Sequence, residues 1–123
     1  MSLLLDTHAL LWLLAGDARI EHLKPKIENP RESVLVSAVC VWEAAIKSAL
    51  GKLRVPDDLP VRLDAFAFES LPVTHEHAWK VRTLPAVHQD PFDRLLAAQA
   101  KCESATMVSA DAVFDRYDVE RIW

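Results

Sequence analysis

The chain has 123 residues, which is long enough for one domain with its own hydrophobic core and short for two. Hydrophobic residues make up 51% and charged residues 26%, a balance that excludes a disordered chain. No apolar run is long enough to cross a bilayer, and the apolar segment 9–16 lacks the basic residues that begin a signal peptide, so we expect a cytoplasmic protein with no membrane partner. The net charge of −4 argues against a nucleic-acid binder unless bound cations make part of the surface positive.

The predicted elements alternate between strands and helices along the chain. Apolar runs rich in branched side chains predict strands, and apolar residues at helical spacing predict helices. In chain order we expect a strand over 2–5, helices over 7–16 and 19–29 (the second interrupted by Pro25), a strand over 33–37, helices over 38–50 and 61–70, a strand over 71–74, helices over 76–84 and 91–103, a strand over 105–109, a short helix over 111–117 and an edge strand over 119–123. This alternation predicts a single α/β domain over 1–123, in which a mainly parallel sheet lies between two layers of helices.

Two acidic residues follow predicted strands. Asp6 comes directly after the first strand, and Asp111 comes shortly after the strand 105–109. In parallel α/β sheets ligands bind outside the carboxyl ends of the strands, so both side chains are candidates for a binding site. Taken singly, each is better explained as the cap of the helix that follows it.

The predicted helix 91–103 begins with two more acids, in the segment HQDPFDRLLAAQA (88–100). Asp90 is a preferred N-cap residue, and Pro91 suits the first helical position. Asp93 lies in the first turn, where the helix macrodipole stabilises a carboxylate. Helix initiation therefore explains both acids when the segment is considered by itself.

Glu43 lies within the predicted helix 38–50, at the edge of an apolar stripe that we expect to face the core. The stripe consists of Val39, Trp42, Ile46, Ala49 and Leu50. Because Glu43 follows the strand 33–37 by less than two helical turns, its side chain can reach over the carboxyl end of the sheet. The alternative is an ion pair with Lys47, four residues further on, on a solvated face of the helix.

Taken together, four carboxylates are predicted to meet at one end of the sheet: Asp6, Glu43, Asp93 and Asp111. Ionised carboxylates in one pocket repel one another, and hard divalent cations remove this cost. Carboxylate and water ligands suit Mg²⁺ or Mn²⁺, which leave positions open for phosphate oxygens, so the site favours phosphodiester hydrolysis. We expect Asp93 to be a metal ligand and Asp90 to be mainly the cap of the helix. The alternative role for Asp90 is to contact one of the metal ligands without binding the metal itself.

Five separated segments match, in order, the motifs of a known family: LLLDTHALLWLL (3–14), VSAVCVWEAAIKSALGKL (36–53), LPVTHEHA (71–78), HQDPFDRLLAAQA (88–100) and MVSADAVFDRYDVERIW (107–123). In these segments, which cover essentially the whole chain, the sequence resembles the PIN-domain ribonucleases, and in particular the VapC toxins of bacterial toxin–antitoxin pairs. The resemblance implies a strand order of 3-2-1-4-5, a Mg²⁺- or Mn²⁺-dependent endoribonuclease, inhibition by a VapB-type antitoxin, and a homodimer.

Carried over motif by motif, the resemblance makes four acids the catalytic metal ligands: Asp6, Glu43, Asp93 and Asp111. Ser109 matches the small hydroxyl residue that often precedes the fourth acid. Asp90 belongs to the motif of a subgroup and is not one of these four ligands. No acid of the family pattern is missing from the chain.

These observations predict a toxin that cleaves single-stranded RNA. We expect its antitoxin to neutralise the acidic pocket with an arginine, whose guanidinium group can bridge two carboxylates. Lys47 and Arg94 could contact RNA phosphates, although solvated charges need no such explanation. Two alternatives stay open: a 5′-nuclease-like or phosphatase activity of the same acids, and a non-catalytic protein-interaction module. Divalent-cation binding separates both enzymes from the module, and RNA cleavage separates the two enzymes.

Two further sets of residues are expected to be structural. The tryptophans are predicted to anchor the core rather than to stack nucleic-acid bases: Trp12, Trp42, Trp79 and Trp123. His75 and His77 are predicted to lie on a helix surface rather than to bind zinc.

Overall fold

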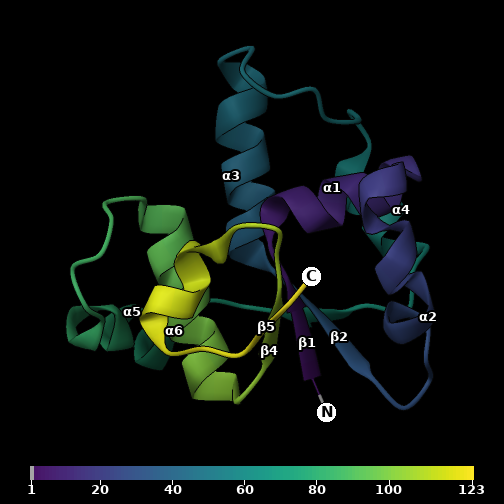
Figure 1. The fold of residues 1–123 in the computed structure, drawn as a ribbon. Coiled ribbons are helices and arrows are strands. Elements are labelled where there is room, and N and C mark those ends of the chain that lie inside the picture. Colours follow the sequence, from purple (N-terminus) through teal and green to yellow (C-terminus); the bar gives the residue numbers. More distant parts are fainter. Residues whose placement is uncertain (1) are drawn as a thin grey trace.

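β1, the apolar strand that begins the chain, is the middle strand of a five-stranded parallel sheet. The computed structural model, which describes residues 2–123, gives the strand order β3-β2-β1-β4-β5 (Figure 1). The strands are β1 (Ser2–Leu5), β2 (Ser33–Ser37), β3 (Glu69–Leu71), β4 (Thr106–Val108) and β5 (Arg121–Ile122). Each neighbouring pair is parallel. The predicted α/β class and the strand order implied by the resemblance are both confirmed.

Helices flank the sheet on both sides. They are α1 (Thr7–Ala15), α2 (Lys24–Ile27), α3 (Ala38–Ala49), α4 (Leu59–Asp64), α5 (His75–Lys80) and α6 (Pro91–Glu103), with the 3₁₀ helices η1 (Ala18–Leu23), η2 (Val81–Thr83) and η3 (Ala112–Tyr117). In Figure 1, α5 and α6 lie to one side of the strands and α1 and α2 to the other, while α3 packs against both α1 and α6. Within residues 2–123, no helix combines the length and the hydrophobicity that a membrane crossing requires.

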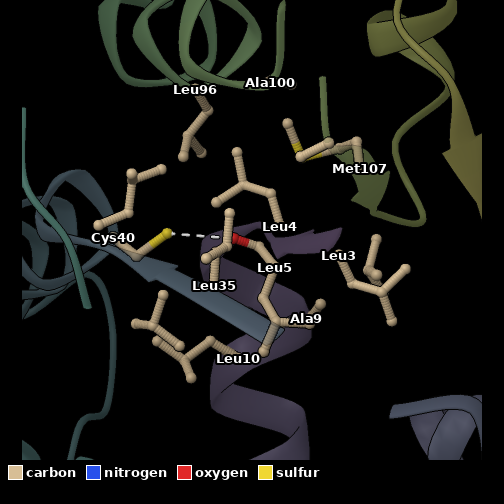
Figure 2. Packing of buried hydrophobic residues seen from close by; sticks show 14 of the residues in the cluster. Leu3, Leu4, Leu5, Ala9, Leu10, Leu35, Cys40, Leu96, Ala100 and Met107 are labelled. Carbon is tan, nitrogen blue, oxygen red and sulfur yellow. Dashed lines mark hydrogen bonds between the residues drawn. The ribbon is translucent and has the colours of Figure 1, made fainter. Parts of the chain in front are cut away.

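The leucines of β1 form the centre of the core. Leu3, Leu4 and Leu5 are fully buried, together with Leu96 of α6 and Met107 of β4 (Figure 2). Burying a leucine side chain contributes roughly 2 kcal/mol to stability. Because both faces of β1 are covered in this way, the residue that follows this strand has a fixed position at the edge of the sheet.

The region between α4 and α5 differs from the prediction. The helix expected over 61–70 ends at Asp64, and the strand expected over 71–74 instead spans Glu69–Leu71. Only Leu71 of β3 is buried, so the strand carries no alternating pattern, and its pairing with β2 decides its position. The strand ends at Leu71, and three residues later the Thr74 side chain caps α5.

Three of the four tryptophans are not core residues, which corrects the prediction. Trp42, Trp79 and Trp123 are 52%, 68% and 37% exposed, and only Trp12 packs half-buried against the core. His77 was expected on a helix surface but is buried, where it completes a capping box with Thr74. Local pattern does not distinguish an aromatic residue that faces the core from one that faces solvent.

The apolar stripe on α3 was predicted to face the core, but most of its residues are exposed to solvent. Trp42, Ile46 and Leu50 are exposed, whereas the buried positions of the helix are Val39, Cys40, Glu43 and Ala44. Both faces of α3 carry apolar residues, and the largest of them, Trp42, lies on the exposed face, where its ring contacts Phe92 of α6. Glu43 is therefore in the middle of the buried face and not at the edge of a stripe.

A buried polar network joins α6 to β2 and to the segment before α5. Gln99 is fully buried, its Oε1 accepts a hydrogen bond from Ser37 Oγ (2.5 Å), and its Nε2 donates to the carbonyl of Pro72 (3.3 Å). The Nδ1 atom of His77 lies 3.3 Å from the same nitrogen. These contacts fix α6 along the sheet, and with it the acids at the start of α6.

Replacing Gln99 with leucine should lower the free energy of unfolding by about 2–4 kcal/mol, because the Ser37 hydroxyl and the Pro72 carbonyl lose their partner while buried. Urea unfolding followed by circular dichroism measures this change. The control is Gln89→Leu at an exposed residue, where a change below about 0.5 kcal/mol is expected. Equal stability of the two variants would show that the network does not hold α6.

Candidate active site

The candidate site lies where the strand order reverses. From β1 the chain proceeds to β2 and β3 on one side, and it returns to β4 on the other side of β1. Such a point leaves a crevice at the carboxyl ends of the two central strands. Leu5 is in register with Val108, and the next backbone N–H, that of Asp6, donates to the Val108 carbonyl (3.1 Å). Asp6 and the residue after Val108 are therefore neighbours.

Asp6 is both a helix cap and a buried acid of the site. Its Oδ1 accepts from the Ala9 N–H (2.8 Å) at the start of α1, and its Oδ2 accepts from the Ser109 hydroxyl (2.5 Å). The residue is only 7% exposed, and burial raises the pKa of its carboxyl above the ordinary value, against the effect of these hydrogen bonds. The cap explanation and the site explanation are thus compatible at this position.

Ser109 connects Asp6 to Asp111. While its hydroxyl donates to Asp6, its Oγ accepts from the Asp111 N–H (3.0 Å). Asp111 is exposed and caps η3 by accepting from the Val113 N–H (3.0 Å). The predicted fourth acid therefore also starts a helix, and it lies at the mouth of the crevice.

Asp90 and Asp93 differ in their surroundings. The Oδ1 of Asp90 accepts from the N–H groups of Phe92 (2.9 Å) and Asp93 (3.1 Å), so Asp90 is the cap of α6, as expected. Asp93 makes no such cap; its Oδ2 lies 3.2 Å from His88 Nε2. Burial raises the pKa of Asp93 to about 6, and the negative charges of Asp90 and Glu43 act in the same direction.

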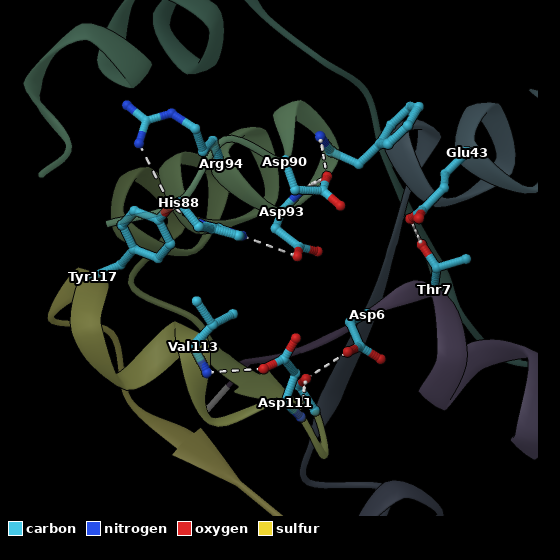
Figure 3. A network of polar contacts seen from close by, with 12 residues as sticks. Asp6, Thr7, Glu43, His88, Asp90, Asp93, Arg94, Asp111, Val113 and Tyr117 are labelled. Atoms are coloured by element: carbon cyan, nitrogen blue, oxygen red, sulfur yellow. Dashed lines mark hydrogen bonds and ion pairs between the residues drawn. The ribbon is translucent and has the colours of Figure 1, made fainter. Parts of the chain in front are cut away.

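A hydrogen-bonded chain behind Asp93 was not identified in the sequence. His88 contacts Asp93 through one ring nitrogen and the hydroxyl of Tyr117 through the other (Figure 3). Arg94 donates to the carbonyl of Pro85 (2.9 Å) and lies 3.4 Å from the same Tyr117 hydroxyl. The position of His88 in the segment 88–100, close to Asp93, could have suggested that it belongs to the site. Its contact with Tyr117 has no local signal, because the two residues lie 29 positions apart. The hydrogen bond from Arg94 to Pro85 thus holds the loop that precedes α6.

Glu43 is buried, and two neighbouring side chains donate hydrogen bonds to its carboxylate. It is 4% exposed, and its carboxylate accepts from the Thr7 hydroxyl (2.5 Å) and from Lys47 Nζ (2.6 Å). The ion pair with Lys47, which was the alternative to a role in the site, is thus present, but Glu43 is not on a solvated face. The thiol of Cys40 on the same face of α3 donates to the Leu5 carbonyl (3.4 Å), which ties this helix to the end of β1.

The carboxylates of Asp6, Asp93 and Asp111 point from separate elements into one space, with Glu43 beside Thr7 at its edge (Figure 3). As they stand, the side chains of residues 2–123 include no group of three or more His, Cys, Asp or Glu that is close enough to hold a metal ion. The donor chemistry nevertheless fits a hard divalent cation, since the nearby groups are carboxylates and their mutual repulsion adds to the effect of burial on the pKa of Asp93.

The PIN domain family model matches residues 3–120. The chain belongs to the PIN-domain family. Three solved structures share this fold: VapBC2 from Rickettsia felis bound to a promoter DNA fragment (18% identity, TM-score 0.74, covering 99% of this chain and 98% of that chain), DNA-bound VapBC from Salmonella typhimurium (16%, 0.75, 99% and 97%), and FitAcB from Neisseria gonorrhoeae (22%, 0.65, 98% and 96%). A comparison with curated proteins finds no match.

Without metal, Asp93→Asn should be about 2–3 kcal/mol more stable than the wild type at pH 7 and equally stable at pH 4. The pKa of Asp93 is raised from 3.8 to about 6 by folding, so the stability associated with its protonated form is complete below pH 4 and is lost as the pH rises through about 6. Asparagine keeps the shape without the charge. Urea unfolding at intervals from pH 4 to pH 7 measures the difference.

The matched control is Asp64→Asn, at an exposed acid of α4, which should keep the pH profile of the wild type. Parallel profiles for the wild type and Asp93→Asn would mean that burial and the neighbouring acids do not raise the pKa of Asp93.

Proposed function

We propose that this protein is a divalent-cation-dependent endoribonuclease that cleaves single-stranded RNA and acts as the toxin of a VapBC-type toxin–antitoxin pair. The observation that carries the proposal is the convergence of Asp6, Asp93 and Asp111 at the reversal point of a PIN-domain sheet. The fold neighbours support it, because they include the solved structures of VapBC2, VapBC and FitAcB. Cytoplasmic location fits this role.

The residues proposed to hold Mg²⁺ or Mn²⁺ are Asp6, Glu43, Asp93 and Asp111. When bound there, the cation supplies Lewis-acid activation of a water molecule and neutralises charge on the phosphate. The protein contributes orientation: Ser109 and the N-terminus of α1 fix Asp6, and His88 fixes Asp93. Groups held in this way need no rearrangement when charge develops on the phosphate.

Lys47 is the cation proposed to meet the RNA backbone. Its Nζ lies 2.6 Å from Glu43, and its side chain is 34% exposed at the edge of the acidic cluster. An ammonium group at this place can contact both the carboxylate and a phosphate oxygen, because it has three donors. Arg94 is the second candidate, although its donors already serve backbone carbonyls.

The partner proposed for the free site is a VapB-type antitoxin that inserts an arginine between the carboxylates. The site is negatively charged and its acids face one space, which suits a planar guanidinium group with several donors. A homodimer of the toxin completes the proposed assembly. The 5′-nuclease or phosphatase alternative uses the same acids and differs only in its substrate, and the interaction module differs in binding no cation.

The purified wild type should cleave single-stranded RNA in Mg²⁺ or Mn²⁺ and lose this activity in a chelator. Asp93→Asn should lower the rate by at least ~100-fold with the fold intact, because it removes a charged ligand. Asp90→Ser is the matched control: it keeps a cap for α6 and most of the activity, whereas Asp90→Ala costs about 1 kcal/mol of stability. Equal losses for Asp90→Ser and Asp93→Asn would make both acids ligands, and a fully active Asp93→Asn would contradict the proposal.

In the antitoxin complex, one arginine of the antitoxin should inhibit the nuclease by contacting the acidic residues of the site. Replacing that arginine with alanine should weaken binding at least ~10-fold to the wild type but much less to Asp93→Asn, because the two groups interact directly. Titration calorimetry of the four combinations measures this coupling. If every arginine of the antitoxin gives the same loss with both toxins, the inhibitor does not enter the acidic site.

A further inference from the structure

An aromatic cluster lies beside the acids and is not needed for the proposed chemistry. His8 and Trp12 are one turn apart on α1, with ring centroids 5.7 Å apart and planes inclined by 46°. The Trp12 ring also contacts Trp123 (5.6 Å), so the end of the chain lies against α1 (Figure 1). On the other side, His22 meets the Trp123 ring edge-on at 5.2 Å.

The cluster opens onto the acids through a hollow of about 290 Å³. Its lining consists of Asp6, His8, Trp12, Ala110 and Asp111. Two of the proposed metal ligands therefore share one surface depression with two aromatic rings. A molecule that reaches the carboxylates from this side must pass over His8 and Trp12.

His8 and Trp12 differ in what the fold requires of them. Trp12 is half-buried, and the guanidinium of Arg19, itself paired with Asp17, lies 4.2 Å from the centre of its ring. This contact holds the indole in place. His8 is exposed and takes part in none of the hydrogen bonds that organise the site in residues 2–123. The charge of His8 lowers the pKa of Asp6, but this effect does not require an aromatic ring that faces the hollow.

We propose that His8 and Trp12 form a stacking site for one unpaired base of the RNA, next to the phosphate that is cleaved. The inference rests on the proposed nuclease function and adds the way in which the substrate is held. A chain with a net charge of −4 attracts phosphates poorly, whereas stacking on an aromatic face does not depend on charge. In a duplex both faces of a base are already covered by its neighbours, so this site selects single strands.

The test is an abasic scan of a short RNA that the wild type cleaves. Asp93→Asn serves as the inactive background, and each RNA of the series lacks one base near the mapped cleavage position. Loss of the stacked base should weaken binding by roughly 5- to 150-fold at one position. In the double variant His8→Ala/Asp93→Asn the intact RNA should bind more weakly by a similar factor, and the penalty at that position should disappear. Fluorescence anisotropy of labelled RNA gives the affinities.

Matched controls are exposed aromatic residues outside the hollow. His75→Ala and Trp79→Leu on α5 should leave both the affinity and the abasic penalty unchanged. Trp12→Leu should act like His8→Ala, and circular dichroism checks its fold, because Trp12 also packs against the core.

The outcomes separate this inference from the proposed function. If the wild type cleaves RNA but no abasic position gives a penalty, or the penalty persists in the His8→Ala background, the stacking site is wrong and the nuclease stands. If the wild type cleaves no RNA in Mg²⁺ or Mn²⁺, the proposed function fails and the stacking site fails with it.

Discussion

The parallel pairing of β1 with β4 is the contact on which the candidate site depends. It places Asp6 and Ser109 side by side, although they lie 103 residues apart in the sequence. The helices that follow the two strands diverge from this pair, so α1 and η3 both begin at the same crevice. Topology alone creates the opening, and the side chains at the strand ends decide what it can bind.

The acids of the site are buried at a cost in electrostatic free energy. Asp6 and Asp93 both have raised pKa values because burial disfavours their charged forms. Neighbouring groups offset part of this cost: the Ser109 hydroxyl and the Ala9 N–H at the start of α1 for Asp6, and His88 for Asp93. The rest is offset by the hydrophobic core around β1, which is why acids that would be unfavourable alone remain in place. A positive group of either kind, cation or guanidinium, gains from the same arrangement.

The sequence pattern was sufficient to locate β1, β2 and β4, which are apolar runs, and the acids Asp6 and Asp111 that follow two of them, whereas the strand order came from the family resemblance. It was not sufficient where long-range pairing decides, as in β3, whose place depends on β2, or where a helix has two apolar faces, as on α3. In the site, the contacts of Glu43 with Thr7 and of His88 with Tyr117 span 36 and 29 residues, and neither pair has a local signature.

The Ser109 hydroxyl has one proton, so it can donate only one of its two hydrogen bonds in the site. The proton goes to Asp6, so towards the Asp111 backbone the oxygen can only accept. A group that withdraws electron density from Asp6 would weaken the hydrogen bond that Asp6 accepts from Ser109, and the Ser109 oxygen would then be a weaker acceptor for the N–H of Asp111. Ser109 Oγ therefore links Asp6, at the end of β1, to Asp111, in the loop after β4. A positive charge bound at Asp6 would change the hydrogen bonds at both places.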